Sequence, residues 1–145
     1  MFGWIFHYHA NMAGTLNEES IATLVDTFYG RVRKDELLSP VFDGVIGDHW
    51  PEHLAKMKDF WSSIMLSTGR YKGNPLMAHL PIPQMDSEHL ERWISLWEMT
   101  TSEIFEPDLA EAFLGKALMI GDRLVSVSTQ VREAQLAAML TASGD

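Results

Sequence analysis

The sequence contains no cysteine, which excludes disulfide bonds, iron–sulfur clusters and thiolate ligation of iron. The lack of cysteine is compatible with a reducing cytoplasm, where we expect the protein to be located. Basic residues are also few: 11 Lys and Arg stand against 20 Asp and Glu, for a formal net charge of -9. A chain of this charge is poorly suited to bind nucleic acid or to dock on anionic membranes. We therefore expect neither as a partner.

Several motifs of enzymes are missing as well. The chain has no HExxH zinc motif, no Glu-x-x-His pair of a di-iron bundle, no GxSxG turn and no glycine-rich phosphate loop. Spacing alone leaves a Ser/His/Asp set open, but nothing points to one. The first eleven residues, MFGWIFHYHAN, are apolar. They are too short to span a bilayer and lack the basic region and cleavage site of a secretory signal.

Large apolar side chains are what the chain has in quantity. Its 145 residues include five Trp, seven Phe and nine Met, and 46% of all residues are hydrophobic. This length is typical of one domain with a sizeable core, and aromatic and Met side chains suit a large apolar cavity as well as a plain core. We expect a folded domain over residues 17–138, with tails at 1–16 and 139–145 and Met12 as an alternative start.

The hydrophobic periodicity is helical throughout, and no segment reads as a strand. It predicts an all-α protein with helices near 18–35, 51–67, 87–104 and 108–138. Start and stop signals agree with these bounds, since each helix is flanked by a capping residue, a first-turn proline or a glycine. These signals are Asn17, Asp86 or Ser87, Pro51, Pro107 and the run Ser67-Thr68-Gly69.

The connection between the first two helices reads as irregular. We expect Pro40 to end the first segment and Val41-Phe42 to form a short apolar plug. Gly44 and Gly47 then mark a loop, and Asp48 caps the next helix.

The stretch from Trp61 to Pro83, WSSIMLSTGRYKGNPLMAHLPIP, contains an isolated histidine between helix breakers. Pro75 can open one helical turn that carries His79, and Pro81 and Pro83 stop that turn at once. One imidazole therefore stands on a short, stiff pedestal among apolar neighbours. Such a histidine has either a structural partner or a ligand, and taken alone the structural explanation is the commoner one.

Three other side chains with polar ends lie on apolar helical faces. Tyr29 borders the stripe of the first helix, His53 lies within the stripe of the second, and Trp93 comes one turn before Trp97. Each has a simple structural explanation: a Tyr with its hydroxyl at the surface, a structural histidine, and aromatic core packing. Their combination with His79 is more specific than any of them alone.

Together these residues resemble the truncated haemoglobins, most closely their third group, from about Glu19 to Val125. The runs that carry the resemblance are FYGRVRKDELLSPVFDGVIGDHWPEHLAKMKDFW and, more specifically, LSTGRYKGNPLMAHLPIP. The Gly-Gly pairs typical of the other groups are absent. The resemblance implies a two-over-two helical sandwich of the globin type, with haem, as protohaem IX, for its cofactor.

The same resemblance implies roles for individual residues. His79 is the expected proximal ligand of the haem iron, and Tyr29, His53 and Trp93 are the expected distal residues, where dioxygen, nitric oxide or carbon monoxide would bind. The expected walls of the haem pocket are Phe28, Phe42, Met57, Phe60, Trp61, Met65, Leu76, Ile82 and Trp97. The haem propionates would meet Arg70, Tyr71 and Lys72, for which a solvated loop is an equal alternative.

Two classes of function stay open at this point. The first is a haem protein that binds diatomic ligands and uses them in redox or nitrogen-oxide chemistry, with dioxygenase or peroxidase-like activity and a reductase as partner. The second is a helical scaffold or partner-binding module without haem. A Soret absorption band in the purified protein would separate them.

Overall fold

The structure, a computed structural model, describes residues 15–73 and 86–143 and contains only helices in these two ranges. The all-α prediction is therefore confirmed. In chain order the helices are α2 (Glu18–Val32), α3 (Leu38–Ile46), the short 3₁₀ helix η1 (Gly47–His49), α4 (Trp50–Leu66), α6 (Ser87–Ile104) and α7 (Pro107–Ser143). His79 and the rest of the expected pedestal turn lie outside the described residues.

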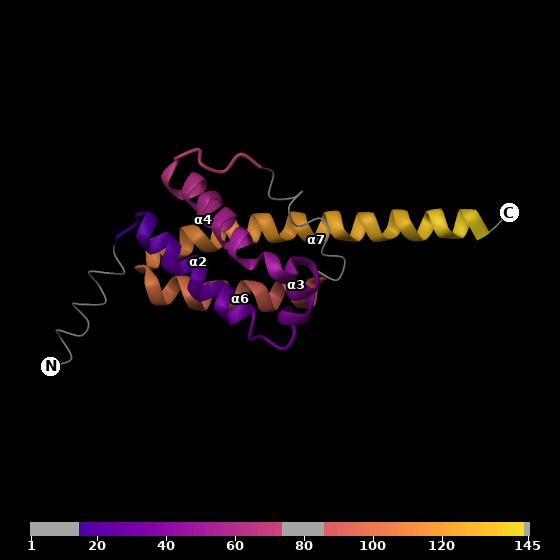
Figure 1. Ribbon diagram of the computed structural model, residues 1–145, viewed down its shortest axis with the longest axis horizontal. Helices are drawn as coiled ribbons and strands as arrows, with labels where there is room; N and C mark the ends of the chain where they lie inside the picture. Colours follow the sequence, from indigo (N-terminus) through magenta and orange to yellow (C-terminus); the bar gives the residue numbers. More distant parts are fainter. Residues whose placement is uncertain (1–14, 74–85, 144–145) are drawn as a thin grey trace.

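Four long helices form two packed pairs. Helix α2 packs against α4, α6 packs against α7, and α2 also contacts α6, so that one pair lies over the other. Figure 1 shows α4 crossing the body and α7 running well past it, with its yellow C-terminal part extending away from the other helices. This arrangement is the expected two-over-two sandwich.

The core between the two pairs is strongly aromatic. Phe28, Phe42, Trp97 and Phe113 are almost completely buried, and each comes from a different helix. The rings of Phe105 and Phe113 stack with their centroids 4.7 Å apart. Aromatic pairs in offset or edge-to-face contact add to the stability that area burial alone provides.

The predicted helix ends are largely confirmed. Asn17 caps α2 through a hydrogen bond from the backbone N–H of Ser20, and the Ser20 hydroxyl accepts in return from the backbone N–H of Asn17. Asp86 caps α6 by accepting from the backbone N–H groups of Glu88 and His89. Helix α4 ends at Leu66, after which Ser67 adopts the left-handed conformation with φ of 58°.

The expectation of a loop around Pro40 was wrong, because the chain forms helix α3 there. The helix begins at Leu38, so Pro40 lies in its first turn. A backbone N–H in the first turn has no intrahelical acceptor, so a proline there loses no hydrogen bond. The side chain of Asp35 accepts hydrogen bonds from the backbone N–H groups of Leu37 and Leu38, both 3.0 Å long. This capping fixes the start of a helix that periodicity did not reveal.

Three other bounds differ from the prediction. Asp48 does not cap α4, because it lies inside η1 and the residue before α4 is His49, which makes no side-chain capping bond. Helix α2 ends at Val32 instead of residue 35, and α7 continues to Ser143, beyond the predicted end at 138. Pro51 does lie in the first turn of α4, as expected.

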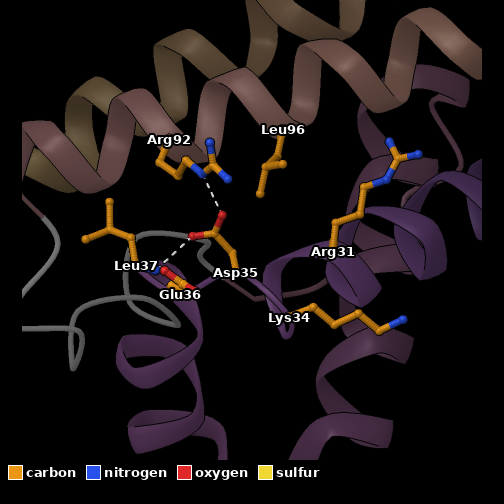
Figure 2. Close-up of a pocket in the computed structure, with 7 residues that line it drawn as sticks. All are labelled: Arg31, Lys34, Asp35, Glu36, Leu37, Arg92 and Leu96. Atoms are coloured by element: carbon orange, nitrogen blue, oxygen red, sulfur yellow. Dashed lines mark hydrogen bonds and ion pairs between the residues drawn. The ribbon is translucent and has the colours of Figure 1, made fainter.

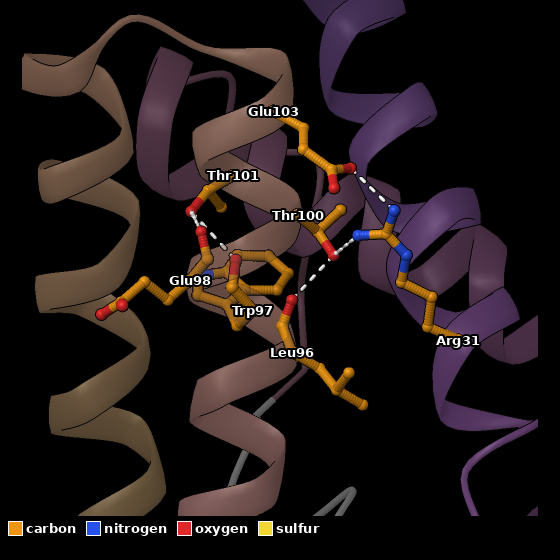
Figure 3. Close-up of polar contacts among 7 residues, drawn as sticks. All are labelled: Arg31, Leu96, Trp97, Glu98, Thr100, Thr101 and Glu103. Atoms are coloured by element: carbon orange, nitrogen blue, oxygen red, sulfur yellow. Dashed lines mark hydrogen bonds and ion pairs between the residues drawn. The ribbon is translucent and has the colours of Figure 1, made fainter.

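Two polar groups tie α2 and the turn after it to α6. Figure 3 shows the Arg31 guanidinium donating to the Thr100 hydroxyl (2.9 Å) and pairing with the Glu103 carboxylate (2.7 Å). Figure 2 shows Arg92 donating from Nε to the buried carboxylate of Asp35, 2.5 Å away. Since α2 carries Tyr29 and α6 carries Trp93, these contacts fix the relative position of two expected site residues.

Among the described residues, no helix combines the length and the hydrophobicity that a transmembrane span requires.

Candidate functional site

Tyr29 and His53 meet in the interior, as their places on apolar faces predicted. The ring of Tyr29, from α2, lies edge-on to the imidazole of His53, from α4, with centroids 5.1 Å apart and an interplanar angle of 88°. Tyr29 is 3% exposed and His53 is half-buried. Tyr29 also contacts Phe42 of α3 edge-to-face, at 6.4 Å between centroids.

Trp93 joins the same cluster through Phe28. The ring of Phe28 lies edge-on to Tyr29 (4.9 Å between centroids) and to Trp93 (5.8 Å). Trp93 is also nearly parallel to Trp97, at 6.3 Å and 9°. At Gly121 of α7 a Cβ atom would lie 3.6 Å from the Trp93 ring. Three helices thus bring Tyr29, His53 and Trp93 into one continuous aromatic cluster.

Hydrogen bonding separates the tryptophans of this cluster into two kinds. The indole N–H of Trp97 donates to the carbonyl of Phe113 (3.1 Å), and that of Trp50 donates to the carboxylate of Asp43 (3.0 Å). Neither the indole N–H of Trp93 nor the hydroxyl of Tyr29 is hydrogen-bonded to any other residue in the described ranges. A buried donor normally has a partner, so these two groups are candidates for a ligand contact.

Tyr29 remains a neutral donor at any physiological pH. Burial raises the pKa of its phenol well above the ordinary value, because the charged phenolate would be desolvated. No hydrogen bond or neighbouring charge offsets that effect. The phenol can therefore donate a hydrogen bond to a polar ligand and keep its proton.

The remaining wall residues in the described ranges come from α4. Met57, Phe60 and Trp61 are buried, and Met65 is half-buried. Trp61 stacks on Trp97 at 4.6 Å between centroids, which joins this wall to the core of α6 and α7. The wall residues Leu76 and Ile82 lie outside the described residues, as does His79.

The basic loop after α4 is held by local contacts. The backbone N–H of Tyr71 donates to the Ser63 hydroxyl (2.8 Å), and its ring lies edge-on to Phe60. Burial raises the pKa of the Tyr71 phenol. Arg70 pairs with Glu18 at the start of α2, at 2.8 Å, and half of its side chain stays exposed. A propionate would therefore share Arg70 with an existing carboxylate partner.

Trp50, which the sequence analysis missed, is a neighbour of two candidate site residues. It is buried, lies 5.9 Å from the ring of Tyr29 and 5.6 Å from that of His53, and contacts both at steep angles. Its position directly before Pro51 marked only a helix start. One signal was available: Trp50 precedes His53 by three residues, which places both on one helical face.

One cavity among the described residues lies outside the aromatic cluster. It has a volume of about 500 Å³ and lies between the end of α2, the turn after it and α6 (Figure 2). Five of its seven lining side chains are charged: Arg31, Lys34, Asp35, Glu36 and Arg92. An apolar disc such as a porphyrin would not be stable there. The described ranges also contain no group of His, Asp and Glu that could hold a metal ion.

Comparison with known proteins gives a consistent result. No protein-family model matches the chain. The chain is 39% identical over 109 residues to the group 3 truncated hemoglobin ctb of Campylobacter jejuni, which covers 73% of this chain and 86% of the relative. It is 27% identical over 117 residues to the group 2 truncated hemoglobin YjbI of Bacillus subtilis, and this match covers 77% of this chain and 85% of the relative. The crystal structure of the C. jejuni group III truncated hemoglobin matches with a TM-score of 0.71 and 37% identity, over 77% of this chain and 91% of that one.

The two-over-two helical sandwich is that of a globin, which is a haem-binding protein. The chain belongs to the truncated haemoglobin family, and within it to the third group. This membership decides between the two classes of function in favour of the haem protein.

The described residues fit a haem with a small polar ligand. The cluster offers apolar walls from Phe28, Phe42 and Met57, and two neutral donors, Tyr29 and Trp93, that have no acceptor among the described residues. The apolar walls suit the porphyrin, which is an apolar disc. The two donors would stabilise a diatomic molecule that carries negative charge. The residue types of the cluster are thus compatible with the cofactor.

Proposed function

We propose that this globin binds dioxygen, nitric oxide and carbon monoxide at protohaem IX, and that it uses dioxygen in redox or nitrogen-oxide chemistry in the cytoplasm instead of transporting it. The observation that carries the proposal is the pair of buried donors, Tyr29 and Trp93, in one apolar cluster. His79 is the proposed ligand of the iron, on the strength of the family resemblance. Bound haem supplies an iron centre that takes a diatomic ligand and exchanges electrons with it.

The two donors favour retention of dioxygen over its release. Dioxygen at a ferrous haem carries partial negative charge, and a hydrogen bond to a charged group contributes about 1.5–3 kcal/mol. Because about 1.4 kcal/mol corresponds to a factor of ten, each donor would slow oxygen release by about ten- to a hundredfold. A transport protein must release its ligand, whereas a protein that carries out chemistry on oxygen benefits from holding it.

His53 would act as a gate or a weak contact, not as a second tight ligand. Tyr29 and Trp93 lie on rigid helical faces deep in the cluster, while the imidazole of His53 is only half-buried. The wall residues Phe60, Trp61, Met65 and Trp97, with Leu76 and Ile82, would enclose the porphyrin. Arg70 and Tyr71 would meet the propionates at the mouth of the site.

The reaction we propose as the test is conversion of nitric oxide and dioxygen to nitrate. Each nitrate formed consumes one electron, so turnover needs a reductase partner or a chemical reductant. When the oxygen-loaded protein is mixed with nitric oxide, we expect stoichiometric nitrate and a lower yield in Tyr29→Phe, since oxygen then escapes before it reacts. Loss of oxygen without nitrate in the parent protein would contradict the proposal.

A further inference from the structure

Trp50 completes a closed group of three rings with the two distal residues on its side of the cluster. Its ring centroid lies 5.9 Å from Tyr29 and 5.6 Å from His53, and these two lie 5.1 Å from each other. The Trp50 and His53 planes are nearly perpendicular, at 89°. The edge-to-face contact restricts rotation of the imidazole on that side, because close packing leaves few rotamers available.

Trp50 is itself held from the protein surface. Its indole N–H donates to Oδ1 of Asp43 (3.0 Å), and Oδ2 of the same carboxylate accepts from the Ser39 hydroxyl (3.2 Å). The guanidinium of Arg33 covers the indole face, with Cζ 4.7 Å from the ring centroid. Asp43 and Arg33 are both exposed, so the buried ring is fixed by two groups that do not reach the site.

We propose that Trp50 is a positioning residue that sets the orientation of the Tyr29 phenol and the His53 imidazole toward the ligand, and that Asp43 holds it in place. This inference rests on the proposed function, because the effect is measured on a diatomic ligand at the haem. Asp43 acts only through Trp50. The strength of the distal hydrogen bonds is thereby linked to a carboxylate at the surface, on a helix that carries none of the donors.

Variants at Asp43 give the sharpest test, since this residue is exposed and its replacement removes no buried side chain. Asp43→Ala removes the acceptor of the indole N–H, while Asp43→Asn keeps an amide oxygen in the same place. Trp50→Phe removes the N–H and keeps an aromatic ring. Asp26→Ala is the matched control, because Asp26 is also exposed and contacts α4 through Lys58, at 3.0 Å, but does not accept from Trp50.

Two measurements on the haem-loaded proteins report the orientation of the donors. The infrared C–O stretching bands of the carbon monoxide complex respond to nearby hydrogen-bond donors, and stopped-flow mixing gives the oxygen dissociation rate. We expect Asp43→Ala and Trp50→Phe to redistribute the C–O bands and to raise oxygen dissociation by about two- to tenfold. Asp43→Asn and Asp26→Ala should keep the bands and the rate of the parent. The double variant Asp43→Ala/Trp50→Phe should match Trp50→Phe, since both changes act through one contact.

The inference is overturned if Asp43→Ala keeps the parent's bands and oxygen rate, even when its melting temperature falls, because Trp50 then has a structural role only. It is equally overturned if Asp43→Asn behaves like Asp43→Ala. Failure of the proposed function gives a different result: Tyr29→Phe would then leave the C–O bands and the oxygen rate unchanged, whatever the Asp43 variants do.

Discussion

The buried polar atoms show which side chains of the cluster are structural and which are available to a ligand. Trp50 and Trp97 both donate to protein acceptors, the Asp43 carboxylate and the Phe113 carbonyl. Tyr29 and Trp93, equally buried, have no acceptor within the described ranges. A ligand in the proposed site would give these two donors an acceptor.

The proximal side is predicted to depend on one side chain. We expect His79→Ala to yield a folded protein that holds haem weakly, because no other imidazole is expected on that side and the pedestal itself is retained. Absorption spectra and haem titration of the variant would measure the loss, and added imidazole should restore part of the Soret band. An unchanged spectrum and haem affinity would show that His79 is not the ligand.

At this scale, periodicity predicted the placement of single residues well but not their neighbours. The spacing of apolar residues put Tyr29, His53 and Trp93 on inward faces, and the structure has all three in one cluster. It could not identify Trp50 as their neighbour, because the Asp43 acceptor that anchors it becomes adjacent only when α3 and α4 fold against each other. A helical face specifies direction, whereas contact partners come from tertiary packing.

Helix α3 is the element that sequence patterns failed to predict. Its start is fixed by the side chain of Asp35, three residues upstream. Its proline lies in the first turn, where it does not prevent helix formation. The long helices were predicted because their stripes extend over several turns and their ends carry capping residues. A helix of nine residues offers too few turns for a periodic signal, and its decisive contact is a cap.

The capping carboxylate of α3 makes a prediction about stability. We expect Asp35→Ala to lower the free energy of unfolding at neutral pH by about 1–3 kcal/mol, because the N–H groups of Leu37 and Leu38 lose their acceptor. The exposed side chain of Arg92 limits its share of this effect. Urea unfolding of both proteins measures the difference, and Asp26→Ala, which loses only a surface ion pair, should stay within about 0.5 kcal/mol of the parent.

The difference in unfolding free energy between the parent and Asp35→Ala should depend on pH. Burial alone would raise the pKa of the Asp35 carboxyl, but the hydrogen bonds from Arg92 and from the N–H groups of Leu38 and Leu37 outweigh it and lower the pKa below 3.8. A lowered pKa means that the carboxylate stabilises the fold above pH 3.8 and that this contribution is lost as the pH falls through the folded value. A stability gap that stays constant down to the acid unfolding transition would contradict this account.

At the scale of the whole molecule, the site is a product of how the two helix pairs are joined. Tyr29 and Trp93 come from α2 and α6, and the Arg31–Glu103 and Asp35–Arg92 contacts hold α2 and the turn after it to α6. The sequence indicated that four long helices exist, but not which face meets which. That information lies in long-range polar contacts between residues with no sequence pattern in common, and the family resemblance supplied the missing arrangement.

Tyr29 and Trp93, we propose, donate hydrogen bonds to a polar ligand, and the function proposed for this protein depends most directly on that role. Their effect should be specific to dioxygen, because carbon monoxide is much less polar and gains little from the same donors. Stopped-flow dissociation of both gases from the parent, Tyr29→Phe and Trp93→Phe therefore separates hydrogen bonding from a general loosening of the site. Phe keeps an aromatic ring at each position and removes the donor.

We predict that each substitution speeds oxygen release by about ten- to a hundredfold, the factor that one hydrogen bond to a charged group provides. Carbon monoxide release should change little in either variant. If both variants release oxygen at the parent's rate, or if carbon monoxide release rises by the same factor, the two buried donors do not act on the ligand and the account is wrong.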